Sequence, residues 1–96
     1  MEFAELYLIN YAKINKKTWK DDEYCIEKLK KFFGNSYLHE ISSFDVEKAK
    51  AELLKKRKPS RVNRYLALLK KMFNLAIDWG YVQENPVNRV EFFSEK

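Results

Sequence analysis

The sequence predicts an all-α protein that folds as a single small helical bundle. Its 96 residues include only two glycines and two prolines, so an antiparallel β fold would lack the turn residues that it needs. Apolar residues make up 46% of the chain and recur at helical spacing, which is enough to build one core. At this length we expect one domain over residues 1–96 and no room for a large enzyme.

The first two helices are predicted by apolar stripes and by signals at their ends. The first covers about residues 2–13, and its stripe consists of Phe3, Leu6, Tyr7, Tyr11 and Ile14. The second begins at Thr18, which forms with Asp21 a pattern resembling a capping box, and ends before Gly34. Its stripe consists of Cys25, Ile26, Leu29, Phe32 and Phe33. We therefore expect Cys25 to fill the core rather than act as a reactive thiol.

The third helix is predicted to begin at a second capping box, formed by Ser42 and Asp45. Its apolar stripe consists of Val46, Ala49, Leu53 and Leu54. It should end near Lys56, because Pro59 disfavours helical geometry in the residue before it.

The fourth helix, about residues 61–79, is the longest, with Ser60 expected as its cap and Gly80 as its end. At 100° per residue, the arc expected to face the core consists of Val62, Tyr65, Leu66, Leu69, Phe73, Ala76 and Ile77, with Met72 at its edge. The opposite side presents Ser60, Asn63, Arg64, Ala67, Lys70, Lys71 and Asn74. Leu68 and Leu75 lie outside both arcs, so either another segment covers them or they form a protein contact.

The positive charge is concentrated in one stretch of the chain. The net charge is +5, yet no acidic residue occurs between Glu52 and Asp78. The basic residues in this stretch are Lys55, Lys56, Arg57, Lys58, Arg61, Arg64, Lys70 and Lys71. A solvated helix face is the alternative explanation, but such faces normally mix both signs to relieve repulsion. The excess therefore favours nucleic acid as a partner, and we expect Lys70 and Lys71 among the DNA contacts. Ala67 would allow a duplex to approach the outward side of the fourth helix.

No catalytic, metal or cofactor site is expected. The single His39 lies in a short connection, where we expect it at the surface, and no Ser or Cys has an obvious base beside it. One His and one Cys are too few for a structural zinc site, and the isolated Gly34 and Gly80 exclude a phosphate-cradling loop. The chain also lacks a secretory signal and an apolar run that could span a bilayer, so we expect a cytoplasmic protein.

Several stretches follow one another in an informative order. They are Lys16-Lys17-Thr18, Leu29 to Gly34, Leu38 to Ser42 leading into Phe44-Asp45-Val46, Ser60 to Lys70, Phe73 to Gly80, and Glu84-Asn85-Pro86-Val87. In order and spacing they resemble the core-binding, SAM-like N-terminal domain of the tyrosine recombinases, the phage integrase family. The resemblance covers nearly the whole chain and implies an orthogonal bundle of four to five helices.

The resemblance implies that this domain grips double-stranded DNA at a core recombination site, as one half of a clamp. The residues that would contact DNA lie at the starts of the second and fourth helices: Lys16, Lys17, Thr18, Lys20, Ser60, Arg61, Asn63 and Arg64. The family's catalytic residues are missing, since the chain has no His-x-x-Arg. A catalytic domain would therefore follow Lys96, with residues 85–96 leading into the linker, and other recombinase subunits would join it in synapsis. No nucleotide cofactor is implied.

Two alternatives remain open: an independent helical DNA-binding regulator and a helical protein-interaction module. A helix-turn-helix regulator would have a tight turn before its recognition helix, where this chain has the stretch 56–59, Lys-Arg-Lys-Pro. An interaction module would explain Leu68 and Leu75 but not the stretch without acids. Trp19 and Trp79 stand next to helix ends, and we expect them to anchor packing rather than to stack on bases.

Overall fold

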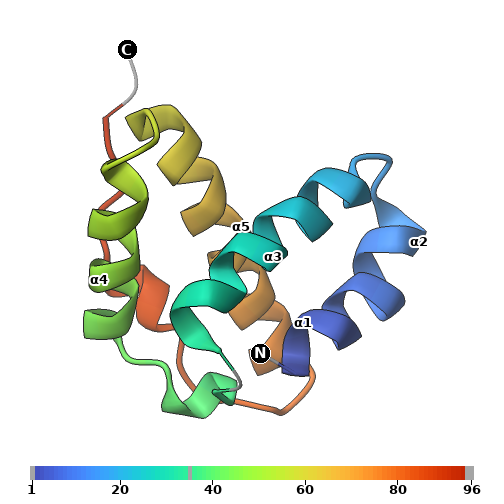
Figure 1. The fold of residues 1–96 in the computed structure, drawn as a ribbon. Coiled ribbons are helices and arrows are strands. Elements are labelled where there is room, and N and C mark those ends of the chain that lie inside the picture. The colour runs from blue at the N-terminus through green and yellow to red at the C-terminus, as the bar shows by residue number, and fades with distance from the viewer. Residues whose placement is uncertain (1, 35, 95–96) are drawn as a thin grey trace.

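Helices form every regular element of residues 2–34 and 36–94, the part of the chain that the computed structural model describes (Figure 1). In chain order they are α1 (Glu2–Tyr7), the π-helix η1 (Leu8–Ala12), α2 (Lys13–Asn15), α3 (Trp19–Phe33), the 3-10 helix η2 (Leu38–Glu40), α4 (Ser43–Leu54), α5 (Pro59–Asp78) and the 3-10 helix η3 (Pro86–Arg89). Because α1, η1 and α2 follow one another without a break, the predicted all-α bundle of four main helices is confirmed.

The long helix α5 is the centre of the bundle, and α1, α3, α4 and η3 all pack against it. In Figure 1, α4 lies on one side of α5 and the α1–α2 segment on the other, with α3 crossing in front. The starts of α3 and α5 and the end of α4 lie at the upper end of the molecule, whereas η2 and the end of α5 lie at the lower end. No helix of the described residues is long and apolar enough to cross a membrane.

The first helical segment contains a π-helical stretch that changes the face it buries. The backbone N–H of Lys13 donates to the carbonyl of Leu8, five residues back, as in a π-helix. The buried side chains of the segment are Phe3, Ala4, Tyr7, Leu8 and Ala12. The prediction that Ile14 faces the core is wrong, since 74% of this residue is exposed. The extra residue in the π turn rotates the following residues away from the face that a regular α-helix would bury.

Helix α3 begins after Thr18 and ends at Gly34, as predicted, but its capping box does not form. The side chain of Thr18 makes no capping hydrogen bond, and the N–H of Asp21 donates instead to the Thr18 carbonyl at 3.0 Å. Gly34 has a φ of 56°, a backbone conformation that glycine adopts without strain. Of the predicted stripe, Cys25, Ile26, Leu29 and Phe33 are buried, whereas Phe32 is 39% exposed. Cys25 is thus a core residue, as expected.

Helix α4 begins at the predicted capping box. The backbone N–H of Asp45 donates to the Ser42 hydroxyl at 3.2 Å, and the Asp45 carboxylate accepts from the Ser42 N–H at 3.0 Å. These hydrogen bonds from Ser42 lower the pKa of Asp45 below its ordinary value. Val46, Ala49 and Leu53 form the buried stripe, while Leu54, the last residue of the helix, is 38% exposed.

We expect Ser42→Ala to lower the free energy of unfolding by about 1 kcal/mol, because the N–H of Asp45 would lose its capping acceptor. Urea unfolding followed by circular dichroism measures the change. Ser60→Ala is the matched control, since Ser60 is exposed and does not cap a helix. Equal losses in the two variants would contradict the role of the box.

Helix α5 starts earlier than predicted. Its N-cap is Lys58 and Pro59 occupies the first helical turn, so the assignment of Ser60 as the cap is wrong. Proline suits this position because its φ is already helical and its missing amide would have no partner there. The helix ends before Gly80, as predicted, and Gly80 has a φ of 81°.

The apolar arc of α5 is buried as predicted, except that Ile77 is only half-buried. Leu68 and Leu75 are buried as well, with exposures of 7% and 9%. Other parts of the same chain therefore cover both leucines, which decides between the two explanations left open by the sequence.

The segment that follows α5 packs along that helix. The buried amide of Asn85 donates to the Lys70 carbonyl at 3.1 Å and to Asn74 Oδ1 at 2.9 Å, and its oxygen caps η3 by accepting from the N–H of Val87. Val87 and Val90 are buried in the core. Residues 85–93, expected to lead into a linker, are therefore part of the bundle, and residues 95–96 lie outside the described chain.

Candidate nucleic-acid interface

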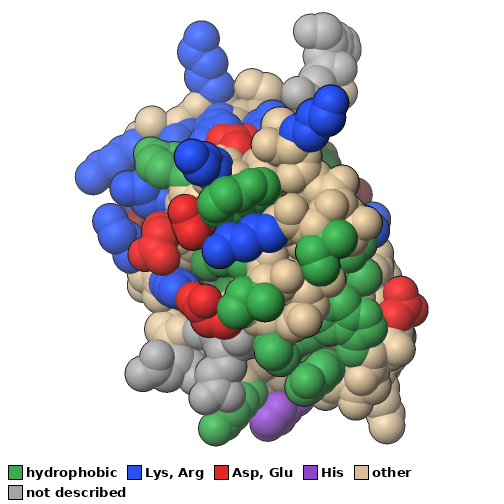
Figure 2. Space-filling model, turned by 90° about the vertical axis from the view of Figure 1, so that its right-hand side faces the viewer, with side chains coloured by type: hydrophobic (Ala, Val, Ile, Leu, Met, Phe, Trp, Pro, Cys, Tyr) green, Lys and Arg blue, Asp and Glu red, His purple; other side chains and the backbone are tan. Residues whose placement is uncertain are grey.

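Most of the predicted DNA-contacting residues lie at the end of the bundle where α3 and α5 begin. We call this surface the cationic end and define it by the exposed side chains of Lys17, Thr18, Lys20, Lys56, Lys58, Ser60 and Arg64, with the half-exposed Lys16 and Arg61. Figure 2 shows Lys and Arg side chains over the upper part of one face, interspersed with Asp and Glu side chains, and an apolar area lower down. The fold brings Asp21, near the start of α3, against Arg61 and Arg64 of α5, which lie about forty positions further along the sequence.

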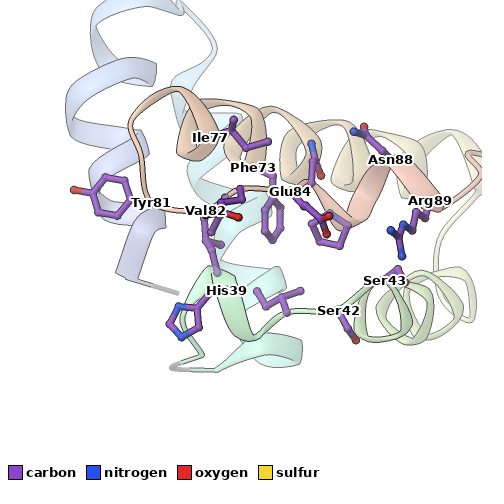
Figure 3. A pocket seen from close by; sticks show the side chains of 15 residues that line it. His39, Ser42, Ser43, Phe73, Ile77, Tyr81, Val82, Glu84, Asn88 and Arg89 are labelled. Atoms are coloured by element: carbon purple, nitrogen blue, oxygen red, sulfur yellow. The ribbon is translucent and has the colours of Figure 1, made fainter.

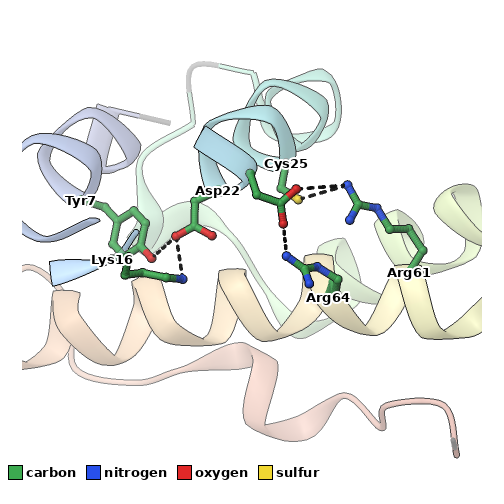
Figure 4. Close-up of polar contacts among 7 residues, drawn as sticks. Tyr7, Lys16, Asp22, Cys25, Arg61 and Arg64 are labelled. Carbon is green, nitrogen blue, oxygen red and sulfur yellow. Dashed lines mark hydrogen bonds and ion pairs between the residues drawn. The ribbon is translucent and has the colours of Figure 1, made fainter. Parts of the chain in front are cut away.

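The arginines of α5 bind an acid from α3. Arg64 pairs with Asp21 through Nη2 and Oδ2, and Arg61 Nη2 lies 3.8 Å from the other oxygen, Oδ1 (Figure 4). The Asp21 side chain is 35% exposed, and those of Arg61 and Arg64 are 33% and 57% exposed. Although this part of α5 contains no acidic residue, Asp21 of the neighbouring helix α3 therefore places a carboxylate beside its arginines.

Arg61 is held by several partners at once. Its guanidinium donates to Cys25 Sγ at 3.9 Å and lies 5.4 Å from the ring centroid of Tyr65 and 5.8 Å from that of Tyr24. Burial raises the pKa of the Cys25 thiol, so the sulfur stays protonated at neutral pH. The planar guanidinium is thereby fixed against aromatic faces in a way that suits Arg better than Lys.

Lys16 belongs to a second ion pair, with Asp22. Lys16 Nζ lies 2.8 Å from Asp22 Oδ2, and the same oxygen accepts a hydrogen bond from the Tyr7 hydroxyl at 2.7 Å (Figure 4). Asp22 is only 6% exposed and Tyr7 is fully buried. Burial and the neighbouring Asp22 carboxylate raise the pKa of Tyr7 above its ordinary value, so its hydroxyl remains a donor. This cluster ties the start of α3 to the first helical segment.

Asn63 does not lie on the outward face of α5 as predicted. It is 5% exposed, its Nδ2 donates to the Phe93 carbonyl at 2.8 Å, and its Oδ1 accepts from the Phe93 N–H at 2.8 Å. The placement was wrong because the chain returns along α5 and covers this position. The Asn63 amide holds residues 90–93 rather than presenting its polar atoms to solvent.

Lys70 and Lys71 are exposed as predicted, but they lie beside different neighbours. Lys71 Nζ is 4.9 Å from the ring centroid of Tyr11 in η1, and Lys70 Nζ is 5.9 Å from that of Phe92 in the C-terminal segment. The open face of α5 is therefore a strip bordered by the first helical segment on one side and residues 90–93 on the other. Along this strip the exposed residues are Ser60, Arg64, Ala67, Lys70, Lys71 and Asn74.

The two tryptophans make packing contacts, as predicted. Trp19 packs partly buried against the core, and Lys13 Nζ and Lys20 Nζ lie 4.9 and 5.8 Å from its ring centroid. The Trp79 ring lies 5.4 Å from that of Phe3, at the other end of the molecule. Trp19 thus helps to position the side chain of Lys20 in the first turn of α3.

Sequence reasoning missed Asp21 and Asp22 as partners of the cations. The sequence pattern pairs Asp21 with Thr18 as a capping box, and Asp21 lies outside the stretch without acids that contains the arginines. The Asp-Asp pair in the first turn of a helix was the available signal, because acids there are stabilised by the helix dipole and can also bind a neighbour. Which cations they meet depends on how α3 crosses α5.

The lower end of the molecule carries an open hollow of about 820 Å³ between η2, the start of α4 and residues 81–89. His39 and Arg89 lie at opposite ends of it (Figure 3). His39 is exposed, as predicted, and its ring stacks on that of Tyr37 at 5.6 Å. Among residues 2–34 and 36–94 no group of three or more His, Cys, Asp or Glu side chains is placed to hold a metal ion.

Comparison with known proteins identifies the family. The family model described as the phage integrase SAM-like domain matches residues 1–93. No curated protein and no solved structure matches the chain significantly. The match covers all of the described helices, including α3 and α5 with the residues of the cationic end. The chain therefore belongs to the phage integrase SAM-like domain family, in agreement with its resemblance to the N-terminal domains of tyrosine recombinases.

Proposed function

We propose that this domain binds duplex DNA through its cationic end, as the core-binding half of the clamp of a tyrosine recombinase. The observation that carries the proposal is the packing of α3 against α5, where Asp21 of α3 pairs with Arg61 and Arg64. Lys17 and Lys20 are exposed near the same start of α3. Backbone amides in the first turn of each helix add partial positive charge at the same end. Membership in the integrase family supports DNA as the polyanion.

The geometry favours contact with the phosphate backbone. The strip on α5 is narrow and contains the small Ala67 between Arg64 and Lys71, so a duplex could lie close to the helix. The Asn63 amide is engaged by Phe93 and is not presented to base edges. Phosphate contacts supply affinity and register but little sequence information. We therefore expect weak, poorly selective binding by the isolated domain.

In this proposal the domain supplies grip and register, and the chemistry belongs to a catalytic domain of the same longer chain. The strand-cleaving tyrosine and its cationic partners would come from that domain, and other recombinase subunits would join it in synapsis. The alternative of a protein-interaction module has lost its main support, because Leu68 and Leu75 are covered within this chain. An independent DNA-binding regulator would use the same surface without a second domain.

Charge reversal at the start of α5 tests the proposal. We expect Arg61→Glu with Arg64→Glu to weaken binding of a short duplex at least tenfold, since each lost phosphate contact also becomes a repulsion. Fluorescence anisotropy of labelled DNA at low salt measures the affinity. Circular dichroism melting shows whether the variant folds.

The matched control is Lys48→Glu with Arg89→Glu, which changes the net charge equally at exposed positions outside the cationic end. We expect it to bind much more tightly than the Arg61 and Arg64 variant. If the wild type and the Arg61 and Arg64 variant bind DNA equally, the cationic end is not the DNA surface.

A further inference from the structure

We infer that Asp21 occupies the place of a DNA phosphate in the free domain and that a phosphodiester group replaces it on binding. The inference rests on the proposed function and adds an atomic site to it. The site consists of the guanidinium groups of Arg61 and Arg64, which converge on the two oxygens of one carboxylate. Arginine forks bind carboxylate and phosphate in the same way, so a site that holds one anion suits the other.

The position of the arginines supports exchange rather than a fixed structural bridge. All three side chains are partly exposed, with 35% of Asp21 and 57% of Arg64 open to solvent. Ion pairs of this kind contribute little to stability. A phosphate arriving from solvent can therefore displace the carboxylate at small cost, and the released Asp21 side chain can turn into water.

Asp22 provides a contrast within the same helical turn. It is 6% exposed and accepts from the buried Tyr7 hydroxyl as well as from Lys16. Removing Lys16 from Asp22 would leave a buried carboxylate without its counter-charge, which is costly. Lys16 is therefore held in place by Asp22. Arg61 and Arg64, by contrast, can release the Asp21 carboxylate and bind a phosphate instead.

Arg61 is also held in position for an incoming anion. Its guanidinium contacts Cys25 Sγ and the rings of Tyr24 and Tyr65. These contacts remain when Asp21 turns away. The arginine then needs little reorganisation, which favours binding of the phosphate.

The exchange predicts that removal of the Asp21 charge strengthens DNA binding. We expect Asp21→Asn to bind a short duplex about fivefold more tightly than Glu23→Gln, since the phosphate no longer has to displace a carboxylate worth up to about 1 kcal/mol. Glu23 is the matched control, because it is an exposed carboxylate in the same first turns of α3 and its replacement changes the net charge equally. Anisotropy titrations at one fixed low salt concentration compare the two variants and the wild type.

The outcomes separate this inference from the proposed function. Equal affinities of Asp21→Asn and Glu23→Gln would overturn the exchange, while DNA binding by the wild type leaves the proposed function intact. Weaker binding by Asp21→Asn would also overturn it and would make Asp21 a positioning residue for the arginines. Absence of wild-type binding would overturn both. Asp21→Ser, which suits the start of a helix, repeats the comparison if the Asn variant melts early.

Discussion

Asp22→Ala is expected to lower the free energy of unfolding by about 2–3 kcal/mol. The substitution leaves the Tyr7 hydroxyl, in a fully buried side chain, without the acceptor that it now has at 2.7 Å. Lys16 adds less to the loss, because its side chain is 35% exposed and its ammonium group can reach water. Urea unfolding followed by circular dichroism gives the difference in free energy.

A double-mutant comparison identifies the cause of this loss. If the unpaired hydroxyl is responsible, Tyr7→Phe in the Asp22→Ala background should recover about 1 kcal/mol or more, because it removes the group that lacks a partner. In the wild-type background the same substitution should destabilise, since Asp22 would lose a donor. An Asp22→Ala variant as stable as the wild type would contradict the role given to this cluster.

The affinity for duplex DNA is expected to fall on the order of a thousandfold between about 50 and 200 mM salt, if about six phosphates are neutralised. Binding through the cationic end and the strip on α5 releases counterions from DNA. The free energy gained from this release becomes smaller as the salt concentration rises, so the affinity falls. Titrations of labelled duplex at several salt concentrations give the slope of log affinity against log salt.

The same series on the Arg61→Glu and Arg64→Glu variant is the control. The slope of its log affinity against log salt should be smaller by the amount that about two phosphate contacts contribute. An affinity that does not change with salt would mean that phosphates contribute little, and the proposed mode of binding would be wrong. A steep slope that is unchanged in the variant would place the phosphate contacts on another surface.

Local signals predicted the helices well. The capping box of Ser42 and Asp45, the glycines at 34 and 80, and the burial of Cys25 were all predicted and are confirmed. Each depends on interactions between residues a few positions apart, or on an apolar stripe whose period the sequence displays. The start of α5 was misplaced because both Pro59 and Ser60 suit the first residues of a helix, and only the backbone path distinguishes them.

The candidate site could be predicted only in part. The sequence indicated the cations at the starts of two helices, but not that Asn63 is covered by Phe93 or that Asp21 binds the arginines. The π-helical stretch that turns Ile14 outward had no signal in the apolar pattern. The sequence identified the residues of the site, but it could not predict which residues they contact.

The sequence by itself determined an all-α bundle, the ends of most helices and a concentration of positive charge in the stretch from Lys55 to Lys71. Only the tertiary structure decided which of those cations are free and which are paired. Asp21 and Arg64 are 43 residues apart, and Asn63 and Phe93 are 30 residues apart. Contacts at such separations depend on how helices cross and where the chain returns, which follow from packing of the whole core and not from any local pattern.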